Sequence, residues 1–195
     1  MRVLVACEFS GIVSQAFRDR GHTAISCDLL ENELTGRQFH HQGDVRDIID
    51  NDWDLMIAHP PCTHLAVSGA RWFKDKVKEQ EEALEFVRFL MDAPIGKICV
   101  ENPVSIISSK IKKPTQIVQP WMFGDPFTKT TCLWLKNLPL LTPTNIVDRG
   151  ERHVTKSGKS LPKWYNLPPS ADRGKLRSRT FQGFAEAMAD QWGTD

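Results

Sequence analysis

Short apolar runs, separated by polar breaks, recur through residues 1–110. Four of them have the length and composition typical of buried strands: Arg2–Ala6, Thr23–Cys27, Trp53–Ala58 and Lys97–Val100. Apolar residues return at helical spacing from Ile12 to Arg20 and from Lys78 to Met91. Strand and helix therefore alternate, and this alternation predicts a parallel sheet with helices on both faces.

The rest of the chain has a different pattern, with eight prolines between Pro114 and Pro169. Thr131–Leu135 predicts a late strand, which we expect to be antiparallel, and Phe184–Trp192 predicts a closing helix. We expect residues 29–42 to be a loop and a short helix to follow near Asp47. We expect residues 148–180 to be irregular.

Composition and cysteine usage narrow the class of protein. The 195 residues are 41% hydrophobic and 25% charged, which fits one globular domain and excludes a disordered, collagen-like or coiled-coil chain. The longest apolar runs are too short to cross a bilayer, and the first residues form no secretory leader. The five cysteines form no C-x-x-C motif, which indicates a reducing compartment. We therefore expect a cytoplasmic protein with no membrane contact.

Charge is distributed unevenly along the chain. The net charge is +1, but residues 148–180 carry nine basic and three acidic side chains, a net of +6. This basic stretch predicts contact with phosphates, although a solvated loop would have the same composition.

Polar side chains follow the predicted strands at the point where each strand ends. Glu8 to Gly11 follow the first, Asp28 the second, Asp44 lies near a third, and Pro60-Pro61-Cys62 and Glu101-Asn102 follow the next two. Ligands of open α/β sheets bind at this edge. An acid after the second strand can bind ribose hydroxyls, and one after the third can accept from an adenine amino group. The first turn lacks G-x-G-x-x-G, so an adenosine cofactor without a pyrophosphate is favoured.

Two of these segments carry a resemblance to a known family. Asp54-Leu-Met-Ile-Ala-His-Pro-Pro-Cys62 followed by Glu101-Asn102-Pro103 resembles the nucleophile and Glu-Asn motifs of the S-adenosylmethionine-dependent DNA cytosine-C5 methyltransferases, and Phe9-Ser10-Gly11 resembles their cofactor turn. The short phage and prophage members are the most similar. The resemblance covers residues 1–138 and the closing helix.

The resemblance implies a Rossmann-like class I methyltransferase fold, with a mostly parallel, doubly wound sheet and a late antiparallel strand. It implies a catalytic S-adenosylmethionine-binding domain over residues 1–138, a small basic substrate-binding subdomain over 139–180, and a helix within 181–195 that packs back. Cys62 would be the nucleophile that adds to carbon 6 of cytosine, and Glu101 the acid near ring nitrogen 3. The expected cofactor-binding residues are Glu8, Phe9, Ser10, Gly11, Asp28, Leu29, Asp44, Val45 and Pro60, and the expected substrate-binding residues are Pro61, Asn102, Lys129, Arg177 and Arg179.

The chain also departs from the family pattern. The Gln-x-Arg-x-Arg segment is replaced by Phe127–Thr131, in which Lys129 is a weak substitute, and Thr63 stands where glutamine is common. Only residues 140–180 are available to read a DNA sequence, which is short for the family. Two rival functions therefore stay open: the same chemistry on a free pyrimidine nucleotide, and a non-catalytic S-adenosylmethionine- or nucleic-acid-binding protein, such as an anti-restriction factor.

Simpler structural roles are possible for several of these residues. Cys62 could be a structural thiol, and Glu101 could lie beside a helix N-cap. Asp28 and Asp44 could cap loops, and Phe9 could be core. His59, Cys62 and His64 could bind a metal, although they have no distant fourth ligand. Trp72 and Phe73 could stack on bases or be buried.

Overall fold

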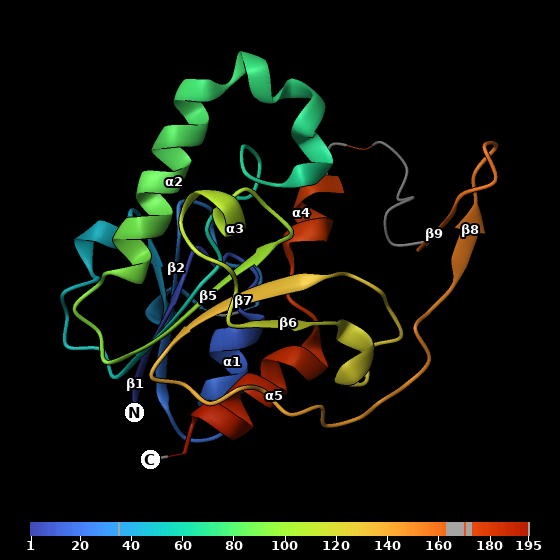
Figure 1. Ribbon diagram of the computed structural model, residues 1–195. Coiled ribbons are helices and arrows are strands. Elements are labelled where there is room, and N and C mark those ends of the chain that lie inside the picture. The colour runs from blue at the N-terminus through green and yellow to red at the C-terminus, as the bar shows by residue number, and fades with distance from the viewer. Residues whose placement is uncertain (35, 163–169, 171–172, 195) are drawn as a thin grey trace.

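A seven-stranded sheet forms the middle layer of the protein in the computed structural model (Figure 1). The structure describes residues 1–34, 36–162, 170 and 173–194, and the side chains of Arg37, Trp72 and Arg173 lie outside the described part. The strands are β1 (Arg2–Ala6), β2 (Thr23–Asp28), β3 (His40–Gln42), β4 (Leu55–Ala58), β5 (Lys97–Pro103), β6 (Gln116–Val118) and β7 (Thr131–Lys136). A separate two-stranded hairpin is formed by β8 (Arg152–Val154) and β9 (Ser160–Pro162).

The strand order is β3-β2-β1-β4-β5-β7-β6. Strands β1 to β5 pair in parallel, whereas β7 runs antiparallel to both β5 and β6. The order reverses between β1 and β4, which makes this the switch point of a doubly wound sheet. This topology is the Rossmann-like class I methyltransferase fold, and the prediction of a mostly parallel sheet with a late antiparallel strand is confirmed.

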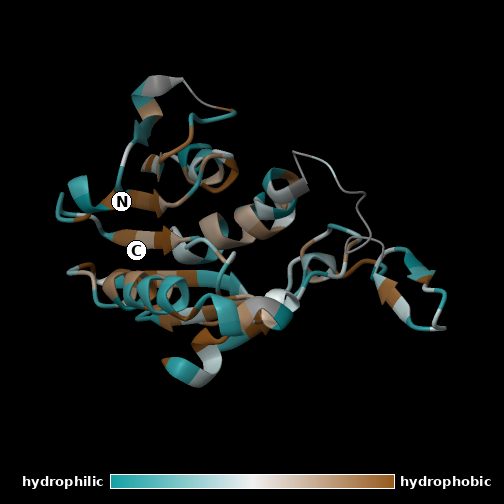
Figure 2. Cartoon of the chain, turned by 90° about the horizontal axis from the view of Figure 1, so that it is seen from above, coloured by the Kyte–Doolittle hydropathy of each residue, from teal (hydrophilic) through white to brown (hydrophobic). Residues whose placement is uncertain are grey.

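Alternation along the strands divides the core into two layers. Val3, Val5 and Ile57 face one side, where they pack with α1 (Ile12–Arg18) and α5 (Gln182–Trp192). Leu4 and Met56 face the other side, where they pack with α2 (Val77–Met91) and the short α3 (Ile107–Lys110). Because both faces are covered, the strands read as continuous apolar runs in the sequence (Figure 2).

Several elements differ from the sequence-based expectations. Residues 29–42 were expected to be a loop, but they contain a 3-10 turn, η1 (Arg37–Phe39), and the edge strand β3. Residues 148–180 were expected to be irregular, but they contain the β8–β9 hairpin and α4 (Arg173–Ser178). Three-residue strands and a six-residue helix are too short to produce a readable periodicity. The remaining 3-10 turns are η2 (Val45–Asp47), η3 (Val67–Asp75) and η4 (Pro120–Met122).

Helix packing brings together the N-terminal and C-terminal parts of the chain. Trp192, Met188 and Ala185 of α5 are buried against α1 and the sheet, so the C-terminal helix belongs to the main body. The β8–β9 hairpin instead projects from this body (Figures 1 and 2). The division of the chain at residues 138 and 180 stays a prediction.

Candidate active site

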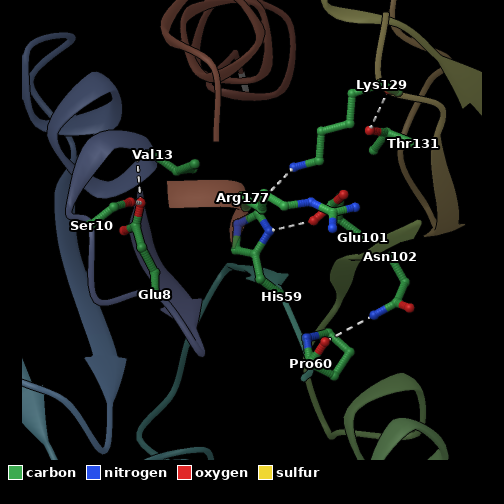
Figure 3. Close-up of polar contacts among 10 residues, drawn as sticks. All are labelled: Glu8, Ser10, Val13, His59, Pro60, Glu101, Asn102, Lys129, Thr131 and Arg177. Atoms are coloured by element: carbon green, nitrogen blue, oxygen red, sulfur yellow. Dashed lines mark hydrogen bonds and ion pairs between the residues drawn. The ribbon is translucent and has the colours of Figure 1, made fainter. Parts of the chain in front are cut away.

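The turn after β1 is organised by a buried carboxylate. Both oxygens of Glu8 accept hydrogen bonds from the N-terminus of α1, at 2.6 Å from the Val13 amide and 3.1 Å from the Ser14 amide (Figure 3). The Ser10 hydroxyl donates to the same carboxylate at 3.4 Å. Glu8 is only 3% exposed, so its carboxylate serves the helix as a cap. The structure therefore turns this predicted cofactor ligand toward the protein.

Gly11 and Phe9 shape the same turn. Gly11 has a φ of 73°, and a Cβ at this position would lie 2.8 Å from Oδ1 of Asn32, so no other residue fits without strain. Phe9 is buried, and the Lys175 ammonium lies 5.3 Å from the centre of its ring.

A pocket of about 270 Å³ opens at the carboxyl ends of β2 and β3. Four of the predicted cofactor-binding residues line this pocket: Asp28, Leu29, Asp44 and Val45. The predicted cofactor residue Pro60 is not part of the lining, whereas Pro61, predicted to bind substrate, is. Sequence reasoning missed four lining side chains: Cys7, Cys27, Arg46 and Phe86. Arg46 lies 5.1 Å from the centre of the Phe86 ring. In the sequence, only its position after a strand end could have indicated Arg46 as a residue of the pocket.

The pKa values of the two acids in this pocket are shifted in opposite directions. Burial raises the pKa of Asp28, although a hydrogen bond from the Leu30 amide opposes the effect. Asp44 accepts from the Arg46 amide at 2.9 Å and forms an ion pair with the Arg46 guanidinium at 2.8 Å, which lowers its pKa. An apolar wall with two acids at its rim fits a nucleoside. The residues present are thus compatible with the adenosine part of S-adenosylmethionine, with Asp28 as the acceptor for its ribose.

The nucleophile segment follows β4 and is fixed by its neighbour β5. The Asn102 side chain donates to the Pro60 carbonyl at 2.8 Å (Figure 3). The amides of Leu65 and Ala66 both donate to the Cys62 carbonyl, which closes the turn. Asn102 is buried, and its side chain holds the Pro-Pro-Cys segment through this bond.

Glu101 lies beside His59 because of the strand register. Ala58 pairs with Val100 in the parallel β4–β5 ladder, so the next residues of both strands are neighbours. His59 Nδ1 lies 2.9 Å from Oε2 of Glu101, and the two side chains are 10% and 14% exposed (Figure 3). Burial alone would raise the pKa of Glu101, but the hydrogen bond and charge of His59, together with the charge of Lys129, lower it.

Cys62 and Glu101 interact electrostatically. Burial and the charge of Glu101 raise the pKa of the Cys62 thiol, whereas the charges of Lys129 and Arg177 lower it. Glu101 and Lys129 also line one cavity of about 10 Å³. The structure thus brings together four predicted residues, Cys62, Glu101, Lys129 and Arg177, from four separate segments.

Helix α4 is tied to this site by polar contacts. The Lys129 ammonium donates to the Arg177 carbonyl at 3.1 Å. Lys175 and Arg179 bind the two oxygens of Glu33 at 2.9 and 2.8 Å. Arg179 is therefore engaged with Glu33, away from Cys62, and nothing in the sequence singled out Glu33.

The other basic side chains are spread over the hairpin and its approach. Arg152 donates to the side chain and carbonyl of Ser160 across the two strands, while Lys156 and Lys159 are exposed at the turn. Arg149 lies 4.9 Å from the centre of the Trp121 ring. Lys163 and the side chain of Arg173 lie outside the described residues.

Two other expectations concern metals and base stacking. In the described part of the chain, no group of three His, Cys, Asp or Glu side chains is arranged to hold a metal ion, so His59, Cys62 and His64 form no such site. Phe73 is half-buried in η3, and the Trp72 side chain lies outside the described part. No described helix has the length and apolarity to span a bilayer.

Comparisons with known proteins give limited information. No protein-family model matches the chain, and no curated protein matches it by sequence. Among solved structures, it is similar to a protein described as a DNA modification methyltransferase encoded within an E. coli prophage, with 16% identity and a TM-score of 0.49. The match covers 76% of this chain and 52% of that one, so the chain spans about half the length of that protein. The fold assigned above therefore rests on the strand order and pairing.

Proposed function

We propose that this protein is a DNA (cytosine-5-)-methyltransferase that uses S-adenosylmethionine. The observation that carries the proposal is the placement of Cys62, in the loop after β4, near Glu101 of the neighbouring strand β5, close enough for the Glu101 charge to raise the pKa of the thiol. A thiol and a carboxylate beside a nucleoside-sized pocket are the two groups that addition to a cytosine ring requires.

The residues of the site have complementary roles in this mechanism. When Cys62 is ionised, its sulfur forms a bond to carbon 6 of cytosine, and the electron pair of the ring's 5,6 double bond becomes available at carbon 5. In this mechanism Glu101, whose pKa is lowered in the free protein, takes up the proton that Cys62 loses on substrate binding and passes it to ring nitrogen 3, which neutralises the charge that develops on addition. S-adenosylmethionine, when bound, supplies an electrophilic methyl group to carbon 5. Carbon 5 then loses its proton to solvent, the bond from carbon 6 to sulfur breaks and returns the thiolate, and Glu101 takes back the proton from ring nitrogen 3.

Positive charge near Cys62 makes this chemistry feasible in a chain without the family's arginine segment. In Figure 3 the Arg177 side chain is directed toward Glu101, and both Arg177 and Lys129 lower the pKa of the Cys62 thiol. Burial opposes them, so the free protein holds Cys62 mainly as a thiol, and ionisation accompanies substrate binding.

Duplex DNA is the proposed substrate because the basic side chains extend beyond the site. A free nucleotide would need one or two cations, and Arg177 with Lys129 would suffice for it. Lys156 and Lys159 on the projecting hairpin would be unused in that case. In duplex DNA the cytosine must be flipped into the site, at a cost of a few kcal/mol that phosphate contacts can offset.

The test uses methyl-labelled S-adenosylmethionine with duplex DNA, single-stranded DNA or dCMP. Label at carbon 5 of cytosine in duplex DNA that is lost in Cys62→Ala supports the proposal. Cys132→Ala, which removes a buried thiol from β7, is the matched control and should retain transfer. Label only in dCMP would assign the enzyme to the nucleotide, and cofactor binding without transfer to any substrate would make it a binding protein.

A second measurement examines the covalent bond. DNA with fluorine at carbon 5 of the target cytosine cannot lose a proton there, so the adduct should persist and increase the mass of the protein. The adduct should be absent in Cys62→Ala and present in Cys132→Ala. Methyl transfer to normal DNA without a trapped adduct would refute the role of Cys62.

A further inference from the structure

One ring nitrogen of His59 contacts Glu101, and the other has no hydrogen-bond partner in the described part of the chain. Nδ1 lies 2.9 Å from Glu101, whereas Nε2 is buried and has no hydrogen-bond partner among the residues that the structure describes. The side chain is 10% exposed. A buried ring nitrogen without a partner is unfavourable unless water or a bound molecule completes the bond.

The direction of Nε2 follows from the shape of the ring. The two nitrogens of an imidazole point in widely different directions, so Nε2 faces away from Glu101. The charge of His59 also lowers the pKa of Asp28, which lines the nucleoside pocket. His59 therefore interacts electrostatically with a residue of the pocket as well as with Glu101.

The chemistry of the ligand follows from the tautomer. A neutral imidazole has one N–H donor and one acceptor. The Glu101 carboxylate can only accept when ionised, so Nδ1 carries a proton in both forms of the ring, and Nε2 is an acceptor when the ring is neutral. The group that it fits is an N–H donor, such as an amino group.

We propose that His59 is a further binding residue of this site: Nδ1 fixes the orientation of Glu101, and Nε2 accepts a hydrogen bond from an amino group of a bound molecule. The inference deepens the proposed function and rests on it. Two molecules of the reaction carry such a group: S-adenosylmethionine has the ammonium group of its amino-acid part, and cytosine has its exocyclic amino group. One contact would couple the orientation of the acid to the presence of a ligand.

Other charged groups surround this pair and bear on its behaviour. Asp28 approaches from β2, Lys129 from the segment before β7, and Arg177 from α4. Lys129 and His59 both lower the pKa of Glu101. In His59→Leu the imidazole contribution is lost and burial dominates, so the Glu101 pKa should rise.

The first experiment observes the ring directly and needs no turnover. Long-range proton–nitrogen NMR spectra of the full chain report Nε2 of His59, identified by its loss in His59→Gln. S-adenosylhomocysteine and dCMP are added separately, and binding is followed by calorimetry. We expect one of them to shift the Nε2 signal and to bind on the order of tenfold more weakly to His59→Gln, the size expected for one buried hydrogen bond. His64→Gln, two residues beyond Cys62, is the matched control and should change neither.

The two ligands separate the sources of the amino group, because a shift with S-adenosylhomocysteine assigns Nε2 to the methyl donor and a shift with dCMP assigns it to the base. No shift when both ligands bind would overturn the role of His59 and leave the proposed function intact. Failure of both ligands to bind would overturn both.

A second experiment tests the link from His59 to Glu101. The limb of the pH–rate profile that belongs to Glu101 should move to higher pH in His59→Leu and return toward the wild-type position in His59→Gln, whose amide N–H can replace the Nδ1 donor. A merely structural role of His59 would lower the rate equally at all pH values.

Discussion

Glu8 offers a clear test of whether a sequence-predicted ligand instead stabilises the fold. Glu8→Ala removes a carboxylate that accepts from two backbone amides at the start of α1 and from the Ser10 hydroxyl. Both amides lie in a buried environment, so water cannot replace the lost acceptor fully. The variant should therefore lose stability.

The magnitude follows from these hydrogen bonds. Each buried donor left without a partner costs about 1–3 kcal/mol, and loss of a helix cap alone costs about 1 kcal/mol. The Ser10 contact at 3.4 Å is long and contributes little. We therefore expect a loss of about 3 kcal/mol in the free energy of unfolding. In a domain of this size, that corresponds to a decrease of roughly 6–12 °C in Tm.

The assay measures two quantities in the same variants. Thermal unfolding followed by circular dichroism gives Tm, and calorimetry with S-adenosylhomocysteine, at a temperature where the variant is folded, gives affinity. Asp28→Asn is the matched control, because Asp28 lines the pocket and accepts from the Leu30 amide in a loop, whereas Glu8 accepts from the first amides of a helix. It should lose affinity with little change in Tm. An unchanged Tm in Glu8→Ala, combined with a large loss of affinity, would refute the reasoning.

Three further predictions concern the contacts around the site. Alkylation of Cys62 by iodoacetamide at pH 7.5 should be several-fold faster in Glu101→Gln and slower in Lys129→Met, because the first charge raises the thiol pKa and the second lowers it; equal rates would contradict this electrostatic coupling. Glu33→Gln should increase amide hydrogen exchange in α4, since Glu33 holds two of its cations, and unchanged protection would show that these ion pairs do not hold the helix. Asn102→Ala should lower Tm by several degrees through loss of the bond to the Pro60 carbonyl, and an unaltered Tm would show that this bond does not stabilise the loop.

The main strands were predictable because they are buried on both faces. Val3–Ala6 and Leu55–Ala58 contain only apolar residues, so the length of each run and the turns that flank it were sufficient to predict a strand. Strands β3 and β6 are the two edge strands of the sheet and have three residues each; because polar residues are tolerated there, hydrophobic patterning did not delimit them.

The sequence was sufficient to predict which residues lie near the site, but less informative about which contacts their side chains make. The carboxyl ends of parallel strands meet at one edge, which is why Asp28 and Asp44 could be expected in the same pocket. Which way each side chain turns depends on local competition for donors. Glu8 turned inward because two amides of α1 had no other acceptor, and Asp44 paired with Arg46. The His59–Glu101 contact depends on the β4–β5 register, which hydrophobic patterning alone does not specify.

The +6 stretch can now be divided by what its cations contact. Lys175 and Arg179 are bound to Glu33, and the charge of Arg177 acts on Cys62, so the hairpin lysines are the better candidates for DNA phosphates. Each phosphate contact contributes about 0.9 to the slope of log affinity against log salt for duplex DNA. The double variant Lys156→Ala/Lys159→Ala should therefore reduce the magnitude of that slope by roughly 2, measured by fluorescence anisotropy across a salt series. Lys78→Ala, which removes a highly exposed lysine of α2, should leave the slope unchanged. If the double variant keeps the wild-type slope, the hairpin does not contact the DNA backbone, and the smaller nucleotide substrate becomes the better match to this short chain.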